Sequence, residues 1–425
     1  MSVALPDAPC LTASPACADS VVPEGLLQVL TQVPDPRDPR GVRYQLATLL
    51  AIGVCAMTTV GHNSLVSVGE WVRRCDQQTL ADLGCPYDPL AGRIRCPDEK
   101  TLRDAYAKVS PGELTRAGYQ RLAALAETAT AGEASALTPQ GMPEREQRRA
   151  QRAARLDPPP PRRRAVFAAD GKCLRGAKRP DGSQLYIFSA VRHQDALTVA
   201  AREVGAKTNE IPEFQPLMEQ IDDEDLNDAV VTLDALHAQR EHARYLVEER
   251  GAHYLLSVKG NQKNLARQLK SLPWKQIPVL HRTAERGHGR EEIRELQVAS
   301  VNGLLFPHAR QVVRIRRRSR PLGEKKWTEE IVYAVTDLPA EQATPAEIIA
   351  WARDHWTIEN SVHWIRDVVF GEDARTIRTR NTPAVMATLG DIVRGTLRAV
   401  GWANTASVRR AHTTPATILK LHGIT

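Results

Sequence analysis

Apolar residues recur along this chain with two different spacings, which divide it into a helical part and a mixed part. In the first part, the segments "GLLQVLTQV" and "LVSVGEWVRRC" place apolar residues every three to four positions, as amphipathic helices do. The apolar stretch 46–60 is too short to cross a bilayer comfortably and predicts a buried helix. This pattern predicts a compact helical domain over residues 25–130.

From residue 165 the pattern changes to short apolar runs that are typical of strands. "LYIFSAVRH" and "ALTVAAREV" are joined by a polar tip at Gln194 and Asp195, which predicts a hairpin. Helical segments then alternate with the buried runs "AVVTLD" and "HYLLSV". An antiparallel start followed by alternating helices and strands predicts an α/β fold with a mixed sheet and flanking helices.

Two segments interrupt these patterns. "PEREQRRAQRAARLDPPPPRRR" predicts a solvated linker, whose arginines could also neutralise DNA phosphates. After "VKGNQ", strand-like runs predict a β-rich insertion, and helical periodicity returns after it. The predicted organisation is a flexible N-terminus (1–24), an all-α N-terminal domain (25–130), a basic Pro-rich linker (131–164), an α/β domain in two pieces (165–262 and 338–400), a β-rich insertion (263–337) and a C-terminal tail (401–425).

Composition narrows the class of protein only moderately. The chain has 425 residues, enough for two or three domains, and a formal net charge of +7. This excess suggests a polyanionic partner, although solvated surface charge explains it equally well. Seven cysteines without a C-x-x-C pair, and a start without a basic and apolar leader, favour a reduced cytoplasmic protein. Neither a P-loop nor a G-x-G-x-x-G sequence supports a nucleotide cofactor.

Two acids stand where short apolar runs end, Asp170 in "AVFAAD" and Asp234 in "AVVTLD". Burying a carboxylate is unfavourable unless it is paired or binds a cation. Strand ends also surround the usual ligand crevice of α/β sheets. A capping or turn role explains either acid alone, but two of them on neighbouring strands indicate a site.

A third acid, Glu359, lies in "DHWTIENSVHW". At about 100° per residue, an α-helix here has a core-facing stripe of Ile358, Val362, Ile365 and Val369. The adjoining polar stripe holds His355, Glu359, His363 and Arg366. Trp356 and Trp364 flank this stripe and are expected to pack. Glu359 is therefore predicted at the edge of the buried face, where it can meet the two strand-end aspartates.

Three carboxylates without cysteine ligands suit Mg²⁺, or Mn²⁺ in its place. Two such ions about 4 Å apart would clamp the attacking and leaving oxygens of a phosphoryl transfer. A zinc site of His355, Glu359 and His363 is an alternative, as is an ordinary polar helix surface. The zinc protease motif spaces its histidines four residues apart, whereas these two are eight apart.

Five motifs in order resemble the H-repeat-associated (ISAs-type) insertion-sequence transposases of the DDE class. They are "AADGKCLRG", "VTLDALHAQ", "LLSVKGNQ", "GHGREEIRE" and "RDHWTIENSVHWIRDVVFGEDARTIRTRN". "VPDPRDPRGVRYQLATLLAIGVCAM" resembles the helical domain associated with that family, so the resemblance covers roughly residues 25–400. The wider group carries Tyr, Arg and Lys where this chain has Ala352, His355 and Arg366, and of these only Arg366 keeps the charge.

The resemblance implies a ribonuclease-H-like catalytic fold with a β-rich insertion before the helix that carries the last acid. It implies that Asp170, Asp234 and Glu359 are the catalytic, metal-binding triad. It also implies cleavage of double-stranded DNA at transposon ends, followed by attack of the 3′ hydroxyl on target DNA by a homodimer. The helical domain is the candidate for DNA-end recognition. Two other hypotheses are a non-catalytic DNA-binding descendant and a nuclease that cuts without joining.

Further residues are expected to contact DNA. Some of them follow Asp170 or the last strand of the sheet within one loop. Three arginines alternate along one strand and therefore share a face. The others lie on the same predicted helix stripe as Glu359. The expected DNA contacts are Lys172, Arg175, Lys259, Asn261, Arg314, Arg316, Arg318, His355 and Arg366.

Overall fold

The computed structural model describes residues 25–131, 164–179, 181–205, 209–287, 289–402 and 404–425. The predicted flexible N-terminus lies outside the described residues, as does the linker apart from its two end residues. Within the described ranges, no helix is long and apolar enough to cross a membrane.

Helices dominate the N-terminal part. They are α1 (Leu26–Leu30), α2 (Leu46–Thr58), α3 (Leu65–Arg74), α4 (Gln77–Asp82), α5 (Glu99–Tyr106) and α6 (Pro111–Ala131). Every residue of α2 is buried, so the prediction of a buried helix is confirmed. This part is not all helical, because β1 (Tyr87–Asp88) and β2 (Arg93–Ile94) form a small hairpin. The Asp88 side chain accepts the main-chain N–H of Leu90, which stabilises the hairpin's turn.

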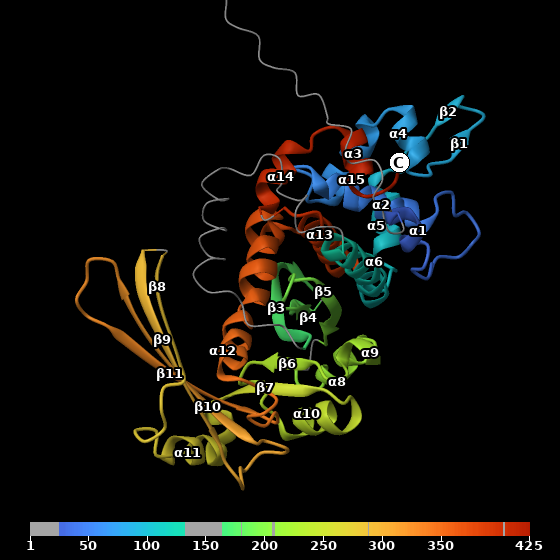
Figure 1. The fold of residues 1–425 in the computed structure, drawn as a ribbon. Coiled ribbons are helices and arrows are strands. Elements are labelled where there is room, and N and C mark those ends of the chain that lie inside the picture. The colour runs from blue at the N-terminus through green and yellow to red at the C-terminus, as the bar shows by residue number, and fades with distance from the viewer. Residues whose placement is uncertain (1–24, 132–163, 180, 206–208, 288, 403) are drawn as a thin grey trace, which may run out of the picture.

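The C-terminal helices complete this helical layer. They are α13 (Thr382–Ala399), α14 (Thr405–Ala411) and α15 (Pro415–Leu421), and they lie beside α1, α2 and α6 (Figure 1). Residues 401–425 are therefore not a tail, since Val408, Ile418 and Leu419 are buried in the same apolar cluster as α2. The main-chain N–H of Leu26 donates to the carbonyl oxygen of His422 at 3.0 Å.

One large mixed sheet forms the centre of the molecule. Within the described residues its order is β5-β4-β3-β6-β7-β11-β10-β9-β8. The strands are β3 (Val166–Lys178), β4 (Gln184–Arg192), β5 (Thr198–Val204), β6 (Val230–Leu233), β7 (His253–Val258), β8 (His281–Gly287), β9 (Arg290–Ser300), β10 (Gln311–Pro321) and β11 (Thr328–Thr336). β3, β6 and β7 run parallel, and the other neighbours pair antiparallel. The predicted mixed sheet and the β4–β5 hairpin are confirmed.

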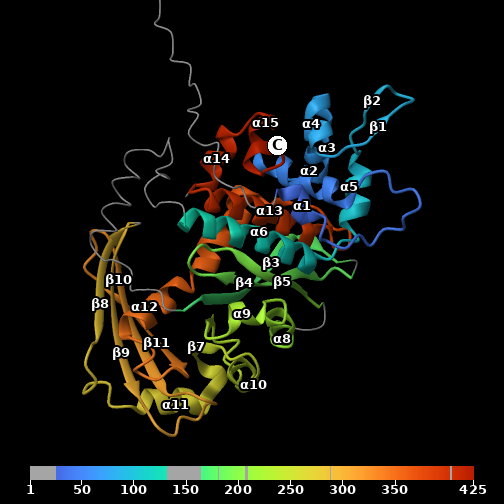
Figure 2. The same ribbon diagram turned by 45° about the vertical axis from the view of Figure 1, so that its right-hand side comes forward.

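The strand-rich segment after β7 extends this sheet. β11 pairs with β7, so β8–β11 continue the sheet and project from the molecule as a blade (Figures 1 and 2). Helix α11 (Lys263–Ser271) and the 3₁₀ turn η3 (Gly260–Gln262) connect β7 to the blade.

Helical elements cover both faces of the sheet (Figure 2). On one face Ala168 of β3 packs with Ile358 and Val362, which belong to the segment after α12 (Pro345–Asp354). On the other face Phe167 and Ala169 belong to a cluster that includes α8 (Phe214–Met218), α9 (Asp223–Leu226), α10 (Arg240–Arg244) and the π-helical η2 (Tyr245–Glu249). Successive residues of β3 thus point to opposite faces.

Candidate active site

The register of two parallel strands brings Asp170 and Asp234 to the same level. The pairing of β3 with β6 ends at Ala169 opposite Leu233. Asp170 and Asp234 are the residues that follow this pair along the chain. Asp234 follows the end of β6, as expected. Asp170 instead lies inside β3, which continues beyond it while pairing with β4. Past this level no residue of β6 pairs with β3 in the described register.

Glu359 reaches the same region from a helical segment that lies over β3. Ile358 and Val362, on either side of it, pack against Ala168 of β3 and Val191 of β4. The predicted core stripe is confirmed at Ile358, Val362 and Ile365, which are buried, whereas Val369 is only partly buried.

The segment that carries Glu359 is π-helical rather than α-helical. It consists of η4 (Glu359–His363) and η5 (Ile365–Val369). The main-chain N–H of Trp364 donates to Glu359, and that of Phe370 donates to Ile365, so both bonds span five residues. The segment after residue 358 therefore departs from the α-helical geometry on which the projection was based. π-helical turns are frequent at functional sites.

The three carboxylates influence one another electrostatically. Burial, followed by the negative charge of Glu210 and smaller effects of Glu359 and Asp234, raises the pKa of Asp170 to about 7. Burial and the charge of Asp234 also raise the pKa of Glu359. The Asp170 side chain is 27% exposed, whereas Asp234 and Glu359 are exposed residues. We call these three acids the carboxylate site.

The donor set of the carboxylate site fits a hard divalent cation. Across the part of the chain that the structure describes, no three His, Cys, Asp or Glu side chains are already arranged to hold a metal ion. The ligand atoms would be carboxylate oxygens, which Mg²⁺ and Mn²⁺ prefer. Burial and nearby negative charges raise the pKa of Asp170, and a cation between the carboxylates would offset both effects.

The two histidines around Glu359 do not converge on it. His355 Nδ1 lies 2.9 Å from Thr232 Oγ1, and His363 Nδ1 lies 3.6 Å from Asp170 Oδ2. Burial lowers the pKa of His355 to about 4 and that of His363 to about 3, so both are neutral at pH 7. The geometry gives no support to a His–Glu–His zinc site, and it corrects the expectation that His355 contacts DNA.

Thr232 connects the strand of Asp234 to the segment of Glu359. Its hydroxyl donates to the carbonyl oxygen of Phe167, and it therefore accepts from His355 Nδ1 and from His193 Nε2 at 3.0 Å. Thr232 lies two residues before Asp234, and His355 lies four before Glu359. The His355–Thr232 bond therefore sets how the two acids face each other. A polar residue inside the buried run "AVVTLD" was the available sequence signal.

Replacing His355 by Ala is expected to weaken both stability and metal-dependent activity. Loss of the buried bond to Thr232 should cost about 1–3 kcal/mol of unfolding free energy. Misplacement of Glu359 should lower metal affinity about tenfold to a hundredfold. Mn²⁺ titration and denaturant unfolding measure the two effects.

Two further substitutions test this role of His355. Thr232→Val removes the same bond, so its effect should not add fully to that of His355→Ala. His355→Gln retains an N–H donor and should restore much of the loss. Full additivity of the first two substitutions would contradict the positioning role.

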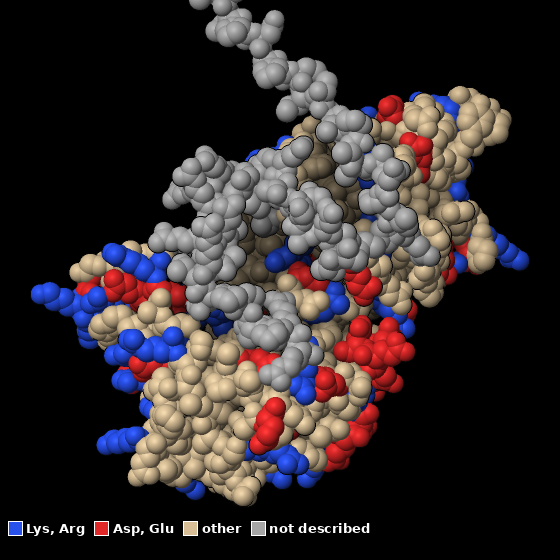
Figure 3. Space-filling model, in the orientation of Figure 1, with Lys and Arg blue, Asp and Glu red and all other residues tan. Residues whose placement is uncertain are grey.

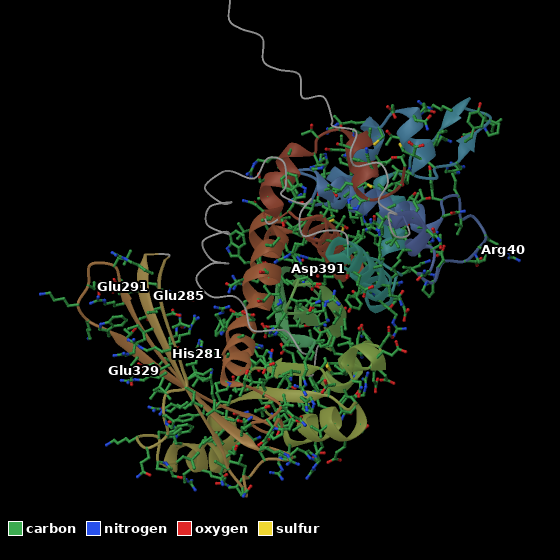
Figure 4. All side chains as sticks on the ribbon, in the orientation of Figure 1. Arg40, His281, Glu285, Glu291, Glu329 and Asp391 are labelled. Carbon is green, nitrogen blue, oxygen red and sulfur yellow. The ribbon has the colours of Figure 1, made fainter. Side chains whose placement is uncertain are left out.

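Two cations that were expected to contact DNA are buried in ion pairs. Lys172 Nζ lies 2.6 Å from Asp367 Oδ1, and its side chain is 7% exposed. Arg366 is 2% exposed and bonds Glu372 through Nε at 3.0 Å. It also approaches Asp391 of α13, which Figure 4 labels. Both expectations are corrected, because both cations are buried beside carboxylates.

Residues near the strand ends remain accessible. Arg175 and Lys259 are exposed, and Arg175 has an ion pair of 3.6 Å with Asp373. Asn261 is exposed, but its amide donates to the carbonyl oxygen of Ala235 and so stabilises the turn after Asp234. Trp356 and Trp364 are 52% and 55% exposed, so the expectation that they pack is wrong.

The three alternating arginines of β10 share one face, but acids and aromatic rings accompany them. Arg316 pairs with Glu329 at 2.6 Å and with Glu295 at 3.5 Å, and Arg318 lies 3.6 Å from Glu295. Arg314 donates to Gln297 and stacks near Trp274. Basic and acidic side chains lie interspersed on the blade in Figure 3, and Figure 4 labels Glu329 there. Arg316 and Arg318 therefore belong to ion pairs and Arg314 to a polar and aromatic contact, so the three do not form an unneutralised basic stripe.

Fold and site together define a mixed α/β protein with a group of carboxylates where the parallel pairing of β3 and β6 ends. The family model described as the transposase DDE domain matches residues 161–389, which include all three acids. A second model, described as DDE_Tnp_1-associated, matches residues 27–120. The chain therefore belongs to the transposase DDE domain family, and the resemblance drawn from its motifs is confirmed.

Two relatives come from Escherichia coli K12, and the name of one of them describes a transposase. The chain is 31% identical to "Putative protein YbfL" and 30% identical to "H repeat-associated putative transposase YhhI", over 233 residues in each case. Each match covers 51% of this chain and 59% of the relative. A piggyBac transposase synaptic complex with hairpin DNA, solved by cryo-electron microscopy, aligns with a TM-score of 0.36 and 10% identity. That alignment covers 93% of this chain and 76% of the other, and at this similarity it carries no argument.

Proposed function

We propose that this protein is a metal-dependent DNA transposase. It cuts DNA at the ends of an insertion sequence and joins the freed 3′ ends to target DNA. The observation that carries the proposal is the carboxylate site, in which burial and neighbouring negative charges raise the pKa values of Asp170 and Glu359 within the segment that matches the transposase family.

We also propose a ribonuclease-H-like core for the catalytic part. The order β5-β4-β3-β6-β7 supports it, with an antiparallel start at β3–β5 and parallel β3, β6 and β7. In this core Asp170 and Asp234 lie just beyond the last parallel pair of β3 and β6, and Asp234 follows the carboxyl end of β6, where ligands of α/β sheets bind. The blade is then the β-rich insertion that precedes the segment with Glu359.

Asp170, Asp234 and Glu359 would hold two Mg²⁺ ions, or Mn²⁺ in their place. Such ions supply Lewis-acid stabilisation of the attacking and leaving oxygens in phosphoryl transfer. The main-chain N–H groups of Leu236 and His237 both donate to Asp234 Oδ1 and orient its carboxylate. Ile358 and Val362 anchor the segment that presents Glu359, so the chain preorganises its acids before DNA binds.

DNA would approach the exposed side of the carboxylate site. Lys259 and Arg175 are both exposed, and both belong to the sequence motifs of the catalytic part. They are our candidates for phosphate contacts. The N-terminal helices would recognise the transposon ends, and a homodimer would hold two ends together. These assignments rest on the family and on the positions of the charges.

The direct test is a strand-transfer assay with purified protein and Mg²⁺. The substrate is a labelled duplex carrying the inverted repeats that flank the gene, together with a target plasmid. We expect cleavage at the repeat end, joined products, and loss of both with EDTA. Cleavage without joining would indicate a nuclease, and binding without metal-dependent cleavage would indicate a non-catalytic descendant.

A further inference from the structure

Gly171, the residue after Asp170, leaves a gap in β3 that another acid fills. A Cβ atom at Gly171 would lie only 1.7 Å from Glu210 Oε1 and 2.8 Å from Oε2. The Glu210 carboxylate therefore lies against the backbone of β3, in the space that a side chain would otherwise occupy. Only glycine permits so close an approach.

Glu210 reaches this gap from the face of the sheet opposite Glu359. Asp170 and Gly171 point to opposite faces, because successive residues of a strand alternate. Glu210 precedes α8, which packs on the Gly171 face. The parallel pairing of β3 with β6 ends at Ala169, one residue before Asp170. Glu210 therefore lies against the residue that follows Asp170, close to the level where this pairing stops.

His237 holds the Glu210 carboxylate in this position. His237 Nε2 lies 3.2 Å from Glu210 Oε2, and its main-chain N–H donates to Asp234 Oδ1 at 3.3 Å. The ring is 1% exposed and stacks on Phe188, the cross-strand partner of Gly171, at 4.7 Å. One buried residue therefore links Glu210 to the turn that carries Asp234.

We infer that Glu210 is a fourth carboxylate of the metal site, admitted by Gly171 and held by His237. This inference rests on the proposed function and adds to it a ligand that the motif pattern lacks. Nothing in the sequence indicates a role for Glu210. It follows a strand but belongs to no periodic pattern, and it lies 40 residues from Asp170 along the chain. With Asp170 and Asp234, it would surround the cation from both faces of the sheet.

Calorimetric titration of the full chain with Mn²⁺ tests the inference without relying on activity. Glu210→Gln should lower Mn²⁺ affinity about tenfold to a hundredfold, or remove one of two bound ions. Glu213→Gln is the matched control, because Glu213 is also 18% exposed but pairs with Arg202. The control should bind Mn²⁺ like the unchanged protein. Equal Mn²⁺ binding by Glu210→Gln and the unchanged protein would overturn the inference.

The close contact at Gly171 offers a second, independent test. Gly171→Ala should weaken Mn²⁺ binding as Glu210→Gln does, because the new methyl group displaces the carboxylate. In a Glu210→Ala background, Gly171→Ala should have no further effect, since the clash is gone. An equal loss from Gly171→Ala in both backgrounds would contradict the inference and indicate a general distortion of β3.

Asp170→Asn separates this inference from the proposed function. If Asp170→Asn loses Mn²⁺ binding while Glu210→Gln retains it, the three-acid site stands and Glu210 is not a ligand. If Asp170→Asn also binds Mn²⁺ normally, the assignment of the carboxylate site itself fails.

Discussion

Replacing Asp170 by Asn, Asp234 by Asn or Glu359 by Gln is expected to abolish metal-dependent DNA cleavage. Each change removes one negative oxygen from a site whose acids would jointly hold the cation. The loss of rate should be at least about a thousandfold, since the cation stabilises both oxygens that exchange at phosphorus. Cleavage of a labelled end duplex in Mg²⁺ measures it, with single-turnover conditions separating chemistry from product release.

The matched control for these variants is Asp223→Asn. The Asp223 side chain is 91% exposed and pairs with Arg250 on the surface. Its loss removes an equal charge from the protein but leaves the carboxylate site intact, so cleavage should be unchanged. Cleavage that persists in any of the three site variants would remove that residue from the proposed site.

Asp170→Asn is also expected to stabilise the metal-free protein at pH 8. Folding raises the pKa of Asp170 from 3.8 to about 7, so the native state binds this proton more tightly than the unfolded chain does. Stability is therefore lost as pH rises between these values, by an amount on the order of 4 kcal/mol. Asn cannot ionise and avoids the loss.

Chemical unfolding in EDTA at pH 4 and pH 8 measures this effect. The variant should be more stable than the unchanged protein at pH 8, and the difference should be small at pH 4. Mg²⁺ should raise the stability of the unchanged protein at pH 8 more than that of the variant, because binding to the native state alone is stabilising. If the variant and the unchanged protein were equally stable in EDTA at both pH values, folding would not raise the pKa of Asp170.

The sequence was sufficient for the features that depend on local pattern. Alternating apolar runs predicted the β4–β5 hairpin, and a continuous apolar run predicted the buried α2. The acids after two buried runs predicted that Asp170 and Asp234 would lie together, and the β3–β6 register places them at one level. In each case the pattern of apolar residues within a short segment decides which of its faces is buried, and this determines the local structure.

The features that the sequence did not predict depend on contacts between distant segments. Lys172 looked like a surface cation because its partner Asp367 lies nearly 200 residues further on. Apolar spacing over ten residues cannot distinguish α-helical from π-helical turns, and it gives no sign that Arg366 is buried beside Glu372 and Asp391. Glu210 became visible only when the fold brought it to Gly171.

Helices from the N-terminal and the C-terminal part of the chain pack in one helical layer, and this has a consequence for folding during synthesis. Helices α1–α5 share their apolar cluster with Leu389, Val408 and Leu419, and Leu26 bonds directly to His422. A chain that leaves the ribosome from its N-terminus therefore presents these helices long before their packing partners exist. We expect the helices to stay bound to a holding chaperone, or to remain loosely packed, until residues near 420 have emerged.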